Sequence, residues 1–363
     1  MKNIKKINNN WIKKFSYPLI ISGPCSAENE KQVLNIAKDL NKSYVEVFRA
    51  GIWKPRTKPG MFEGKEEEGL KWMVKAKKKY NLLLATEVAN KNHVKLALKY
   101  KIDILWIGAR STCNPFTIQE ISDSLKNSKN IILIKNPLNL DIELWIGAIE
   151  RFIKNNIYNI GIIHRGFSIY KSKKYRNQPC WLEVLKLKEK FPNIPILCDP
   201  SHITGDSNKI YEVSKKAINF GYDGLMIETH NNPKKALSDA NQQITPTQLT
   251  EILSKILLKK KIQKKYINTL NIYRNNINEI DENIIYLLKN RFISSNKIGE
   301  IKNKYNLNII QKDIMLKQKN KYKEICKILN LDELLIQKIF DEIHKKSIEL
   351  QLNKKKINTK IKK

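Results

Sequence analysis

Short apolar runs alternate, along most of the chain, with longer segments in which apolar residues recur every three or four positions. The runs have the length and the Ile, Val and Leu content of buried strands, and the longer segments have helical periodicity. The expected strands cover 19–26, 45–51, 82–89, 104–110, 131–137, 160–167, 195–202 and 224–230. The expected helices between them cover 30–40, 69–79, 92–100, 117–125, 141–154, 182–191 and 209–220.

This alternation predicts the fold class. Strands that are each separated by a helix form a parallel sheet, because a parallel pair needs a long crossover connection. Eight such units over about 240 residues have the size of a closed (β/α)8 TIM barrel. A doubly wound open sheet is the alternative, but no GxGxxG motif follows the first strand. We therefore expect an α/β protein with a TIM barrel, followed by a small all-α helical domain.

The pattern becomes purely helical and strongly basic after Pro246. A long helix is expected from about 267 to 305, with an apolar stripe along one face, and two further helices at 313–329 and 332–351. The stripe consists of Ile277, Ile280, Ile284, Leu287, Leu288, Ile298 and Ile301. The expected domains are a lead-in at 1–17, the barrel at 18–258, a basic linker at 259–266, the helical domain at 267–352 and a basic disordered tail at 353–363.

Polar side chains follow most of the expected strands, at the ends where TIM barrels place their chemistry. They are Cys25, Arg49, Lys54, Arg56, Glu87, Arg110, Lys135, His164, Arg165, Asp199, His202, Glu228 and His230. A lone buried cysteine, or a single charge such as Glu87 or His230, is more often structural. Several converging cations, however, repel one another unless an anion neutralises them. We therefore expect a pocket for strongly anionic ligands that carry phosphate or carboxylate groups.

Composition narrows the functional class. The net charge of +33 is spread along the whole chain among Lys, Asn and Ile residues, which indicates compositional drift rather than a nucleic-acid interface. The sequence contains no uncharged apolar run long enough to cross a membrane, and its basic N-terminus lacks the apolar core of a signal peptide. The five cysteines show no paired spacing, so we expect reduced thiols and a cytoplasmic location.

A set of motifs, in order along the first 257 residues, resembles the type I-beta 3-deoxy-D-arabino-heptulosonate 7-phosphate (DAHP) synthases. The motifs are SGPCSAE at 22–28, FRAGIWKPRTKPG at 48–60, ATEVAN at 85–90, WIGAR at 106–110, IKNP at 134–137, IHRG at 163–166, CDPSH at 198–202, IETH at 227–230 and LSDANQQ at 237–243. The resemblance implies condensation of phosphoenolpyruvate with erythrose 4-phosphate, the first step of the shikimate pathway, with release of phosphate.

The resemblance also implies roles for particular residues. The implied ligands of a divalent metal are Cys25, His202, Glu228 and Asp239. A thiolate, an imidazole and two carboxylates suit Mn²⁺, Fe²⁺, Co²⁺ or Zn²⁺ better than Mg²⁺ or Ca²⁺. The implied phosphoenolpyruvate contacts are Arg49, Arg110, Lys135 and Arg165, and the implied erythrose 4-phosphate contacts are Lys54, Arg56 and Thr57. Lys54, Cys25 and His202 would be the catalytic residues.

The sugar-phosphate loop argues against a related family, the 3-deoxy-manno-octulosonate 8-phosphate synthases. Their loop resembles K-x-N-R-[ST], whereas this chain has Lys54-Pro55-Arg56-Thr57.

Residues 266–352 resemble the all-helical chorismate mutases. The implied chorismate contacts are Arg274, Arg291, Lys302, Ser347 and Gln351. In such mutases two subunits interlock, which implies a homodimer or a higher homo-oligomer. Ile314 stands where the family has an arginine, and no glutamate is adjacent, although Lys312, Asp313 or Lys317 could substitute. The alternative for this domain is therefore a non-catalytic module for dimerisation and feedback sensing.

Overall fold

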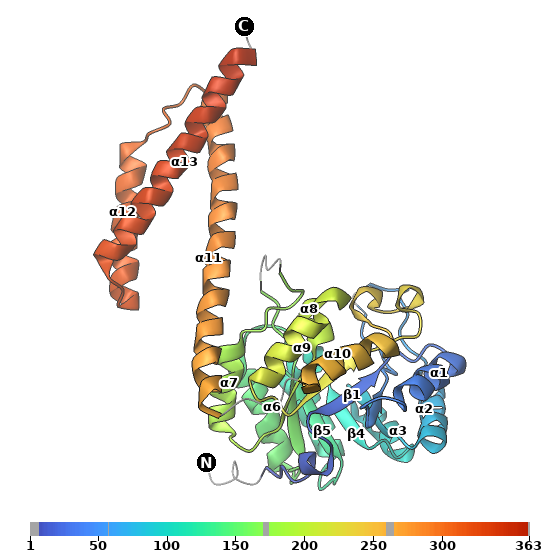
Figure 1. Ribbon diagram of the computed structural model, residues 1–363. Coiled ribbons are helices and arrows are strands. Elements are labelled where there is room, and N and C mark those ends of the chain that lie inside the picture. Colours follow the sequence, from blue (N-terminus) through green and yellow to red (C-terminus); the bar gives the residue numbers. More distant parts are fainter. Residues whose placement is uncertain (1–6, 57, 170–173, 259–264, 362–363) are drawn as a thin grey trace. The chain divides into compact units, whose positions relative to one another are not determined.

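The computed structural model describes residues 7–56, 58–169, 174–258 and 265–361 (Figure 1). The chain divides into two compact units, Met1–Tyr273 and Arg274–Lys363. The first unit contains every strand of the described residues, and the second is helical.

Eight parallel strands close into a barrel in the order of the sequence. The strands are β1 (Leu19–Gly23), β2 (Val47–Arg49), β3 (Leu83–Val88), β4 (Ile104–Ile107), β5 (Ile131–Lys135), β6 (Ile160–His164), β7 (Ile196–Cys198) and β8 (Gly224–Glu228). Strand β1 pairs with both β2 and β8, and its pairing with β8 runs from Leu19–Gly224 to Gly23–Glu228. The predicted (β/α)8 barrel is confirmed, and the open-sheet alternative is wrong.

Helices follow the strands and surround the barrel (Figure 1). They are α1 (Glu30–Leu40), α2 (Glu66–Tyr80), α3 (Lys91–Lys99), α4 (Ala109–Thr112), α5 (Pro115–Ser124), α6 (Ile142–Lys154), α7 (Trp181–Lys190), α8 (Pro200–Thr204), α9 (Ile210–Asn219) and α10 (Pro246–Leu258). Short 3-10 turns occur at η2 (Ile12–Lys14), η3 (Ser207–Lys209), η4 (Pro233–Lys235) and η5 (Ala240–Gln242).

The core of the barrel unit has two parts. Inside the barrel, side chains such as Ile21, Leu133 and Met226 pack on one another, and Trp11 of the N-terminal segment joins this inner cluster. Outside the barrel, the opposite faces of the strands pack against the apolar faces of the helices. Strand residues are therefore buried on both faces, which explains the continuous apolar runs in the sequence.

Several strands end earlier than the sequence predicts. The segments expected as strands at 104–110 and 195–202 each end in a short helix, α4 and α8. Helix α8 starts because the Asp199 side chain accepts a hydrogen bond from the His202 backbone N–H and Pro200 occupies the first helical position. His202 therefore lies on a helix at the rim rather than at a strand end.

The second unit contains α12 (Lys312–Leu329), α13 (Glu333–Ile361) and the part of α11 (Lys265–Lys304) from Arg274 onward. The segment at 353–361, which the sequence predicts to be disordered, continues α13. It contains neither Pro nor Gly, and its lysines are good helix formers. None of the helices in the described residues is long and apolar enough to cross a membrane.

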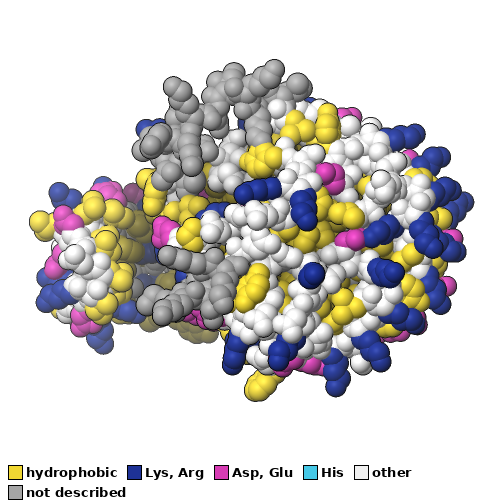
Figure 2. Space-filling view, turned by 90° about the horizontal axis from the view of Figure 1, so that it is seen from below, with side chains coloured by type: hydrophobic (Ala, Val, Ile, Leu, Met, Phe, Trp, Pro, Cys, Tyr) yellow, Lys and Arg dark blue, Asp and Glu magenta, His cyan; other side chains and the backbone are white. Residues whose placement is uncertain are grey.

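The predicted apolar stripe of α11 is largely solvent-exposed within a single chain. Its members Ile277, Leu287 and Ile301 are 56%, 67% and 55% exposed. The basic side chains, in contrast to the apolar residues of this stripe, do not gather in one place. Figure 2 shows Lys and Arg side chains scattered over the visible face rather than gathered in one patch. The exposed stripe is thus the larger departure from an ordinary monomer surface.

Candidate active sites

Cys25 lies just past β1, fully buried at the C-terminal rim of the barrel. Its Sγ is 3.1 Å from Lys54 Nζ and 3.4 Å from Asp239 Oδ2. Its backbone N–H donates to Gln243 Oε1 at 3.0 Å, which ties β1 to the segment after β8. Burial, and then the negative charge of Glu228, raises the pKa of Cys25 to about 12. The thiol therefore stays protonated at neutral pH unless a cation binds the sulfur.

His202 and Glu228 face each other at the same rim, with Nε2 of the imidazole 3.9 Å from Oε1 of the carboxylate. Asp199 orients the ring, because its Oδ2 lies 2.8 Å from His202 Nδ1 and its Oδ1 accepts from the His202 backbone N–H at 3.0 Å. Burial lowers the pKa of His202 below its ordinary value. A neutral imidazole with Nδ1 turned toward Asp199 presents Nε2 as a lone-pair donor.

Cys25, His202, Glu228 and Asp239 form a donor set that suits a divalent ion. In the described part of the chain, no three His, Cys, Asp or Glu side chains are closed around a point that could hold a metal. The separations Cys25–Asp239 and His202–Glu228, 3.4 and 3.9 Å, are nevertheless near those of metal ligands. Bonds of about 2.0–2.3 Å around a tetrahedral ion place donors roughly 3.3–3.8 Å apart. The residues present therefore fit such an ion in chemistry and approximate spacing.

A cavity of about 320 Å³ opens beside these side chains. Its basic lining residues are Lys54, Arg56, Arg110, Lys135, Arg165 and Arg176. The carboxylates in its lining are Glu87 and Asp239. The imbalance of charge favours ligands that carry several negative groups, since guanidinium and ammonium groups bind phosphate and carboxylate oxygens.

Arg49, predicted to contact phosphoenolpyruvate, is not among the residues that line this cavity. It is 1% exposed, and its Nη1 lies 3.1 Å from Glu228 Oε1. Its guanidinium carbon stands 4.7 Å from the centre of the Trp106 ring, and Lys135 Nζ stands 5.9 Å from the same ring. Its Nη2 donates to the Cys25 carbonyl at 3.3 Å, so Arg49 at the end of β2 contacts two residues that are proposed metal ligands.

Arg165 is a buried cation of the lining, and burial lowers its pKa to about 10. Its Nη1 donates to the Gly166 carbonyl at 3.2 Å, and its backbone N–H donates to Asn136 Oδ1 at 2.8 Å. Arg56 is half-buried, and its Nη2 lies 4.0 Å from Met61 Sδ. Thr57, predicted beside it, lies outside the described residues.

Sequence reasoning placed Asp199 at the rim without giving it a role, and it missed Arg176. Asp199 contacts both Lys135 and His202, and Arg176 contacts Asp239 at 3.1 Å. Asp199 follows β7 directly, so its position at the rim was readable from the sequence. Arg176 lies in an irregular segment between β6 and α7, where no periodic pattern indicates which side chains turn inward.

All five predicted contact residues of the helical unit lie on α11 or α13, and two of them, Arg291 and Ser347, are in direct contact. Arg291 Nη1 donates to Ser347 Oγ at 2.5 Å and to the Ile343 carbonyl at 3.4 Å. Gln351 is 8% exposed, and the Oε1 atom of its side chain has no hydrogen-bond partner among the described residues. Lys302 Nζ donates to the Ile309 carbonyl at 2.7 Å.

Arg274 does not join this group within one chain. It is exposed, and seventeen residues of α11 separate it from Arg291, about 25 Å along a helix axis. Ile314, at the position where the resemblance calls for an arginine, is 51% exposed in the first turn of α12. Met315 beside it does line a cavity.

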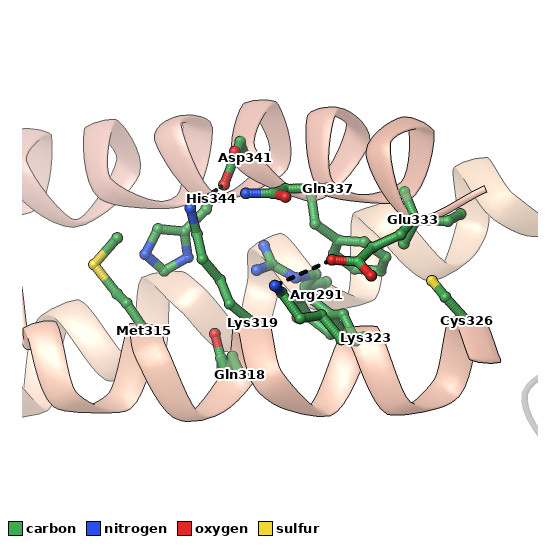
Figure 3. Close-up of a pocket in the computed structure, with 13 residues that line it drawn as sticks. Arg291, Met315, Gln318, Lys319, Lys323, Cys326, Glu333, Gln337, Asp341 and His344 are labelled. Carbon is green, nitrogen blue, oxygen red and sulfur yellow. Dashed lines mark ion pairs between the residues drawn. The ribbon is translucent and has the colours of Figure 1, made fainter. Parts of the chain in front are cut away.

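That cavity, of about 30 Å³, lies between α12 and α13 with Arg291 of α11 behind it (Figure 3). It is large enough for about one water molecule. Lys319 pairs with Asp341 at 3.3 Å, and Lys323 pairs with Glu333 at 3.2 Å. The proposed substitutes Lys312, Asp313 and Lys317 do not line it, whereas Lys319 and Lys323 do.

Comparison with protein families gives two matches. A model described as the DAHP synthetase I family matches residues 11–264, and a model described as chorismate mutase type II matches residues 273–352. A phospho-2-dehydro-3-deoxyheptonate aldolase of Thermotoga maritima is 32% identical over 228 residues, which cover 63% of this chain and 65% of the relative. The match thus spans just under two thirds of that relative's length.

More distant relatives carry the name of a different aldolase. A 2-dehydro-3-deoxyphosphooctonate aldolase of Wolinella succinogenes is 26% identical over 268 residues, covering 66% of this chain and 98% of the relative. Among solved structures, the Thermotoga maritima DAHP synthase superposes with a TM-score of 0.61 at 31% identity, covering 66% of this chain and 68% of that chain. A truncated form of the Thermotoga maritima synthase gives 0.58 at 28% identity, covering 66% and 85%.

Proposed function

Because this chain belongs to the DAHP synthetase I family and carries a chorismate mutase type II match beyond its barrel, we propose that it is a bifunctional DAHP synthase and chorismate mutase. The barrel would join phosphoenolpyruvate to erythrose 4-phosphate and release phosphate. The observation that carries this proposal is the strongly basic cavity beside a thiol, an imidazole and two carboxylates. The two substrates bring two phosphates and a carboxylate, which such a lining neutralises.

The family generally uses a divalent metal ion, and we propose Cys25, His202, Glu228 and Asp239 as the residues that hold it. Sulfur and imidazole donors favour Mn²⁺, Fe²⁺, Co²⁺ or Zn²⁺. When bound, the ion would supply Lewis acidity toward the aldehyde oxygen of the sugar phosphate. Cys25 would enter the site as a thiolate, since binding to a cation removes the proton that burial otherwise holds on the sulfur.

Arg110, Lys135 and Arg165 would bind phosphoenolpyruvate, because their side chains line the cavity from neighbouring strand ends. Arg49 would act from behind, by balancing the charge of Glu228 rather than by touching the substrate. Trp106 would support this group, since its ring faces both Arg49 and Lys135. By binding the phosphate and carboxylate groups, Arg110, Lys135 and Arg165 would fix the orientation of phosphoenolpyruvate and therefore the position of its enol carbon.

Arg56 and Thr57 would bind the phosphate of erythrose 4-phosphate, which places its aldehyde toward Lys54. Burial lowers the pKa of Lys54, but the negative charges of neighbouring groups outweigh burial and raise it above its ordinary value. Lys54 is therefore protonated and can donate a proton to the aldehyde oxygen. The new bond joins C3 of phosphoenolpyruvate to the aldehyde carbon, water adds at C2, and phosphate leaves.

The test is release of phosphate from phosphoenolpyruvate by metal-loaded protein. We expect turnover with erythrose 4-phosphate and little with arabinose 5-phosphate, the sugar of the octulosonate branch. Turnover with arabinose 5-phosphate alone would overturn the proposal in favour of that alternative. The match to the octonate aldolase, 26% identical against 32% for the heptonate aldolase, makes this alternative the less favoured one.

We propose chorismate-to-prephenate rearrangement for the helical unit. The reaction is unimolecular, so fixed cations and donors around the dianion suffice for catalysis. Arg291, Lys302, Ser347 and Gln351 supply such groups from one chain, and the resemblance assigns Arg274 to the site of a partner copy. The test is loss of chorismate on addition of the full chain, with Arg291→Ala as the inactive control.

The second candidate for this unit is a non-catalytic module for dimerisation and feedback sensing, favoured by Ile314 and Met315. It predicts that chorismate or prephenate changes the rate of the reaction in the barrel without being consumed.

Both candidates require self-association, which we propose because the α11 stripe is exposed. Leu287→Lys should therefore shift the sedimentation coefficient to that of a smaller species, whereas Leu237→Lys on the barrel, at a position 54% exposed, should not. We also propose a cytoplasmic location, where both sets of substrates would be made.

A further inference from the structure

Arg176 and Gln242 form a relay that holds one oxygen of each carboxylate proposed as a metal ligand. Arg176 Nη1 donates to Asp239 Oδ1 at 3.1 Å and to Gln242 Oε1 at 2.7 Å. Gln242 Nε2 then donates to Glu228 Oε2 at 2.7 Å. One guanidinium nitrogen and one amide therefore connect the two carboxylates.

The other oxygen of each carboxylate faces the remaining two donors. Asp239 Oδ2 lies 3.4 Å from Cys25 Sγ, and Glu228 Oε1 lies 3.9 Å from His202 Nε2. The relay thus holds one oxygen of each carboxylate and leaves Asp239 Oδ2 and Glu228 Oε1 facing the other two donors, although Glu228 Oε1 also accepts a hydrogen bond from Arg49 Nη1 at 3.1 Å. This arrangement is a property of the described side chains and does not depend on which ion is bound.

We propose that Arg176 and Gln242 are positioning residues that make Asp239 and Glu228 bind the metal through one oxygen each, and that they thereby set the affinity of the site. The inference rests on the metal assignment proposed above. Hydrogen bonds to the oxygens that do not bind the metal fix the rotation of a carboxylate, and losing such contacts typically weakens metal binding about 10- to 100-fold.

The geometry of Gln242 makes the relay directional. Its side chain is 1% exposed, so the amide cannot exchange its contacts for water. Its oxygen accepts from Arg176 and its nitrogen donates to Glu228. In the reverse orientation the amide N–H groups would face the Arg176 donor, and the amide oxygen would face the Glu228 carboxylate. Arg176 comes from the segment between β6 and α7, whereas Gln242 lies in η5 after β8. The relay therefore also joins two separate rim segments across the site.

The experiment measures the affinity of the full chain for Co²⁺ by competition with a chromophoric chelator. The variants are Arg176→Met and Gln242→Leu, which remove the donors and keep most of the side-chain volume. Arg151→Met is the matched control, because Arg151 is a half-buried arginine on α6 that donates to the Gly147 carbonyl. We expect Co²⁺ binding about 10- to 100-fold weaker in either relay variant and unchanged in the control.

Two further readouts separate positioning from a general loss of structure. The double variant should bind Co²⁺ about as tightly as the weaker-binding single variant. The two effects should not add, because both changes break the same relay. The d–d absorption of bound Co²⁺ should weaken in the variants, as a freed carboxylate binds through both oxygens and raises the coordination number. Circular dichroism confirms the fold, and Gln242→Glu provides a second variant in which a like charge faces Glu228.

Unchanged Co²⁺ affinity in the folded relay variants would overturn the inference. So would unchanged affinity together with a raised KM for the sugar phosphate, because Arg176 would then be a substrate contact from the cavity lining. Failure of the metal assignment gives a different result: wild-type protein binds no Co²⁺, or Cys25→Ser binds it as tightly as wild type. Weak binding by Cys25→Ser with wild-type binding by both relay variants would reject the relay alone.

Discussion

Lys135 Nζ lies 2.7 Å from Asp199 Oδ2, and this same oxygen lies 2.8 Å from His202 Nδ1. The side chains of Lys135 and Asp199 are 6% and 0% exposed. Burial raises the pKa of Asp199, but the contacts of its carboxylate with His202 and Lys135 outweigh burial and hold the pKa well below its ordinary value. An ionised carboxylate therefore couples a proposed substrate lysine to a proposed metal ligand.

Replacing Asp199 with Asn tests this coupling, because the amide keeps the shape and removes the charge. Lys135 would be left as an uncompensated buried cation, so we expect a loss of about 3–5 kcal/mol in the free energy of unfolding, measured in urea. KM for phosphoenolpyruvate should rise more than KM for erythrose 4-phosphate. Asp103→Asn is the control: the Lys77–Asp103 pair at 2.6 Å is partly exposed and should contribute about 0–1 kcal/mol. Equal losses in both variants would contradict the argument.

Cys25→Ser should lose divalent metal while the barrel stays folded. The hydroxyl is nearly isosteric with the thiol, but it binds borderline ions poorly at neutral pH. Metal content after dialysis, measured by elemental analysis, should fall to a small fraction of the wild-type ratio. Cys113→Ser should keep its metal, because Cys113 Sγ hydrogen-bonds to the Ala109 carbonyl and the Leu138 backbone N–H and is not a proposed ligand. Full occupancy in Cys25→Ser would reject the ligand assignment.

His164 gives a prediction about pH and stability. It is buried among aromatic rings, its Nε2 lies 2.6 Å from the Pro179 carbonyl, and the Tyr222 hydroxyl lies 2.9 Å from its Nδ1. Nε2 therefore donates to the carbonyl, and Nδ1 accepts from the hydroxyl. Burial lowers the pKa of His164 to about 3, so the folded protein keeps the ring neutral at pH values where the unfolded chain protonates it.

The folded pKa lies below the unfolded value of about 6.5, so stability is fully present above pH 6.5 and is lost as the pH falls toward 3. The full loss from this group is on the order of 5 kcal/mol, most of which falls within the accessible range above pH 4. His164→Gln cannot titrate, so its free energy of unfolding should fall less steeply between pH 6.5 and 4 than that of wild type. Parallel curves from urea titrations at several pH values would show that His164 is not buried as a neutral ring.

The sequence predicted the barrel because its signals are local. The alternation that gives β5 and α6 is visible at 131–135 and 142–154, and Asp141 caps the helix by accepting a hydrogen bond from the Leu144 backbone N–H. The rim position of Cys25 followed from the end of an apolar run. Element boundaries were less accurate, as at Pro200, where a cap and a proline start a helix inside the predicted strand.

Contacts between distant segments could not be predicted from these patterns. Arg176 meets Asp239 and Gln242 across more than sixty residues of sequence, and its own segment has no periodicity. Arg49 was expected beside a substrate, yet it faces Glu228, because a strand-end position gives the depth of a side chain without its partner. The stripe of α11 was predicted as one apolar face, but most of its members are exposed within a single chain.

Ile314→Arg tests whether the helical unit lacks a cation that its reaction needs. Ile314 is 51% exposed in the first turn of α12, so an arginine there should change the free energy of unfolding by no more than about 0.5 kcal/mol. One preorganised donor at a developing charge is worth about 100- to 1000-fold in such sites, so we expect kcat/KM for chorismate to rise at least about tenfold. Leu316→Arg is the control, because it is 62% exposed on the same helix but turned about 200° away. A similar rise in both variants would indicate a general charge effect, and no rise in Ile314→Arg would show that the unit does not use a cation at this position.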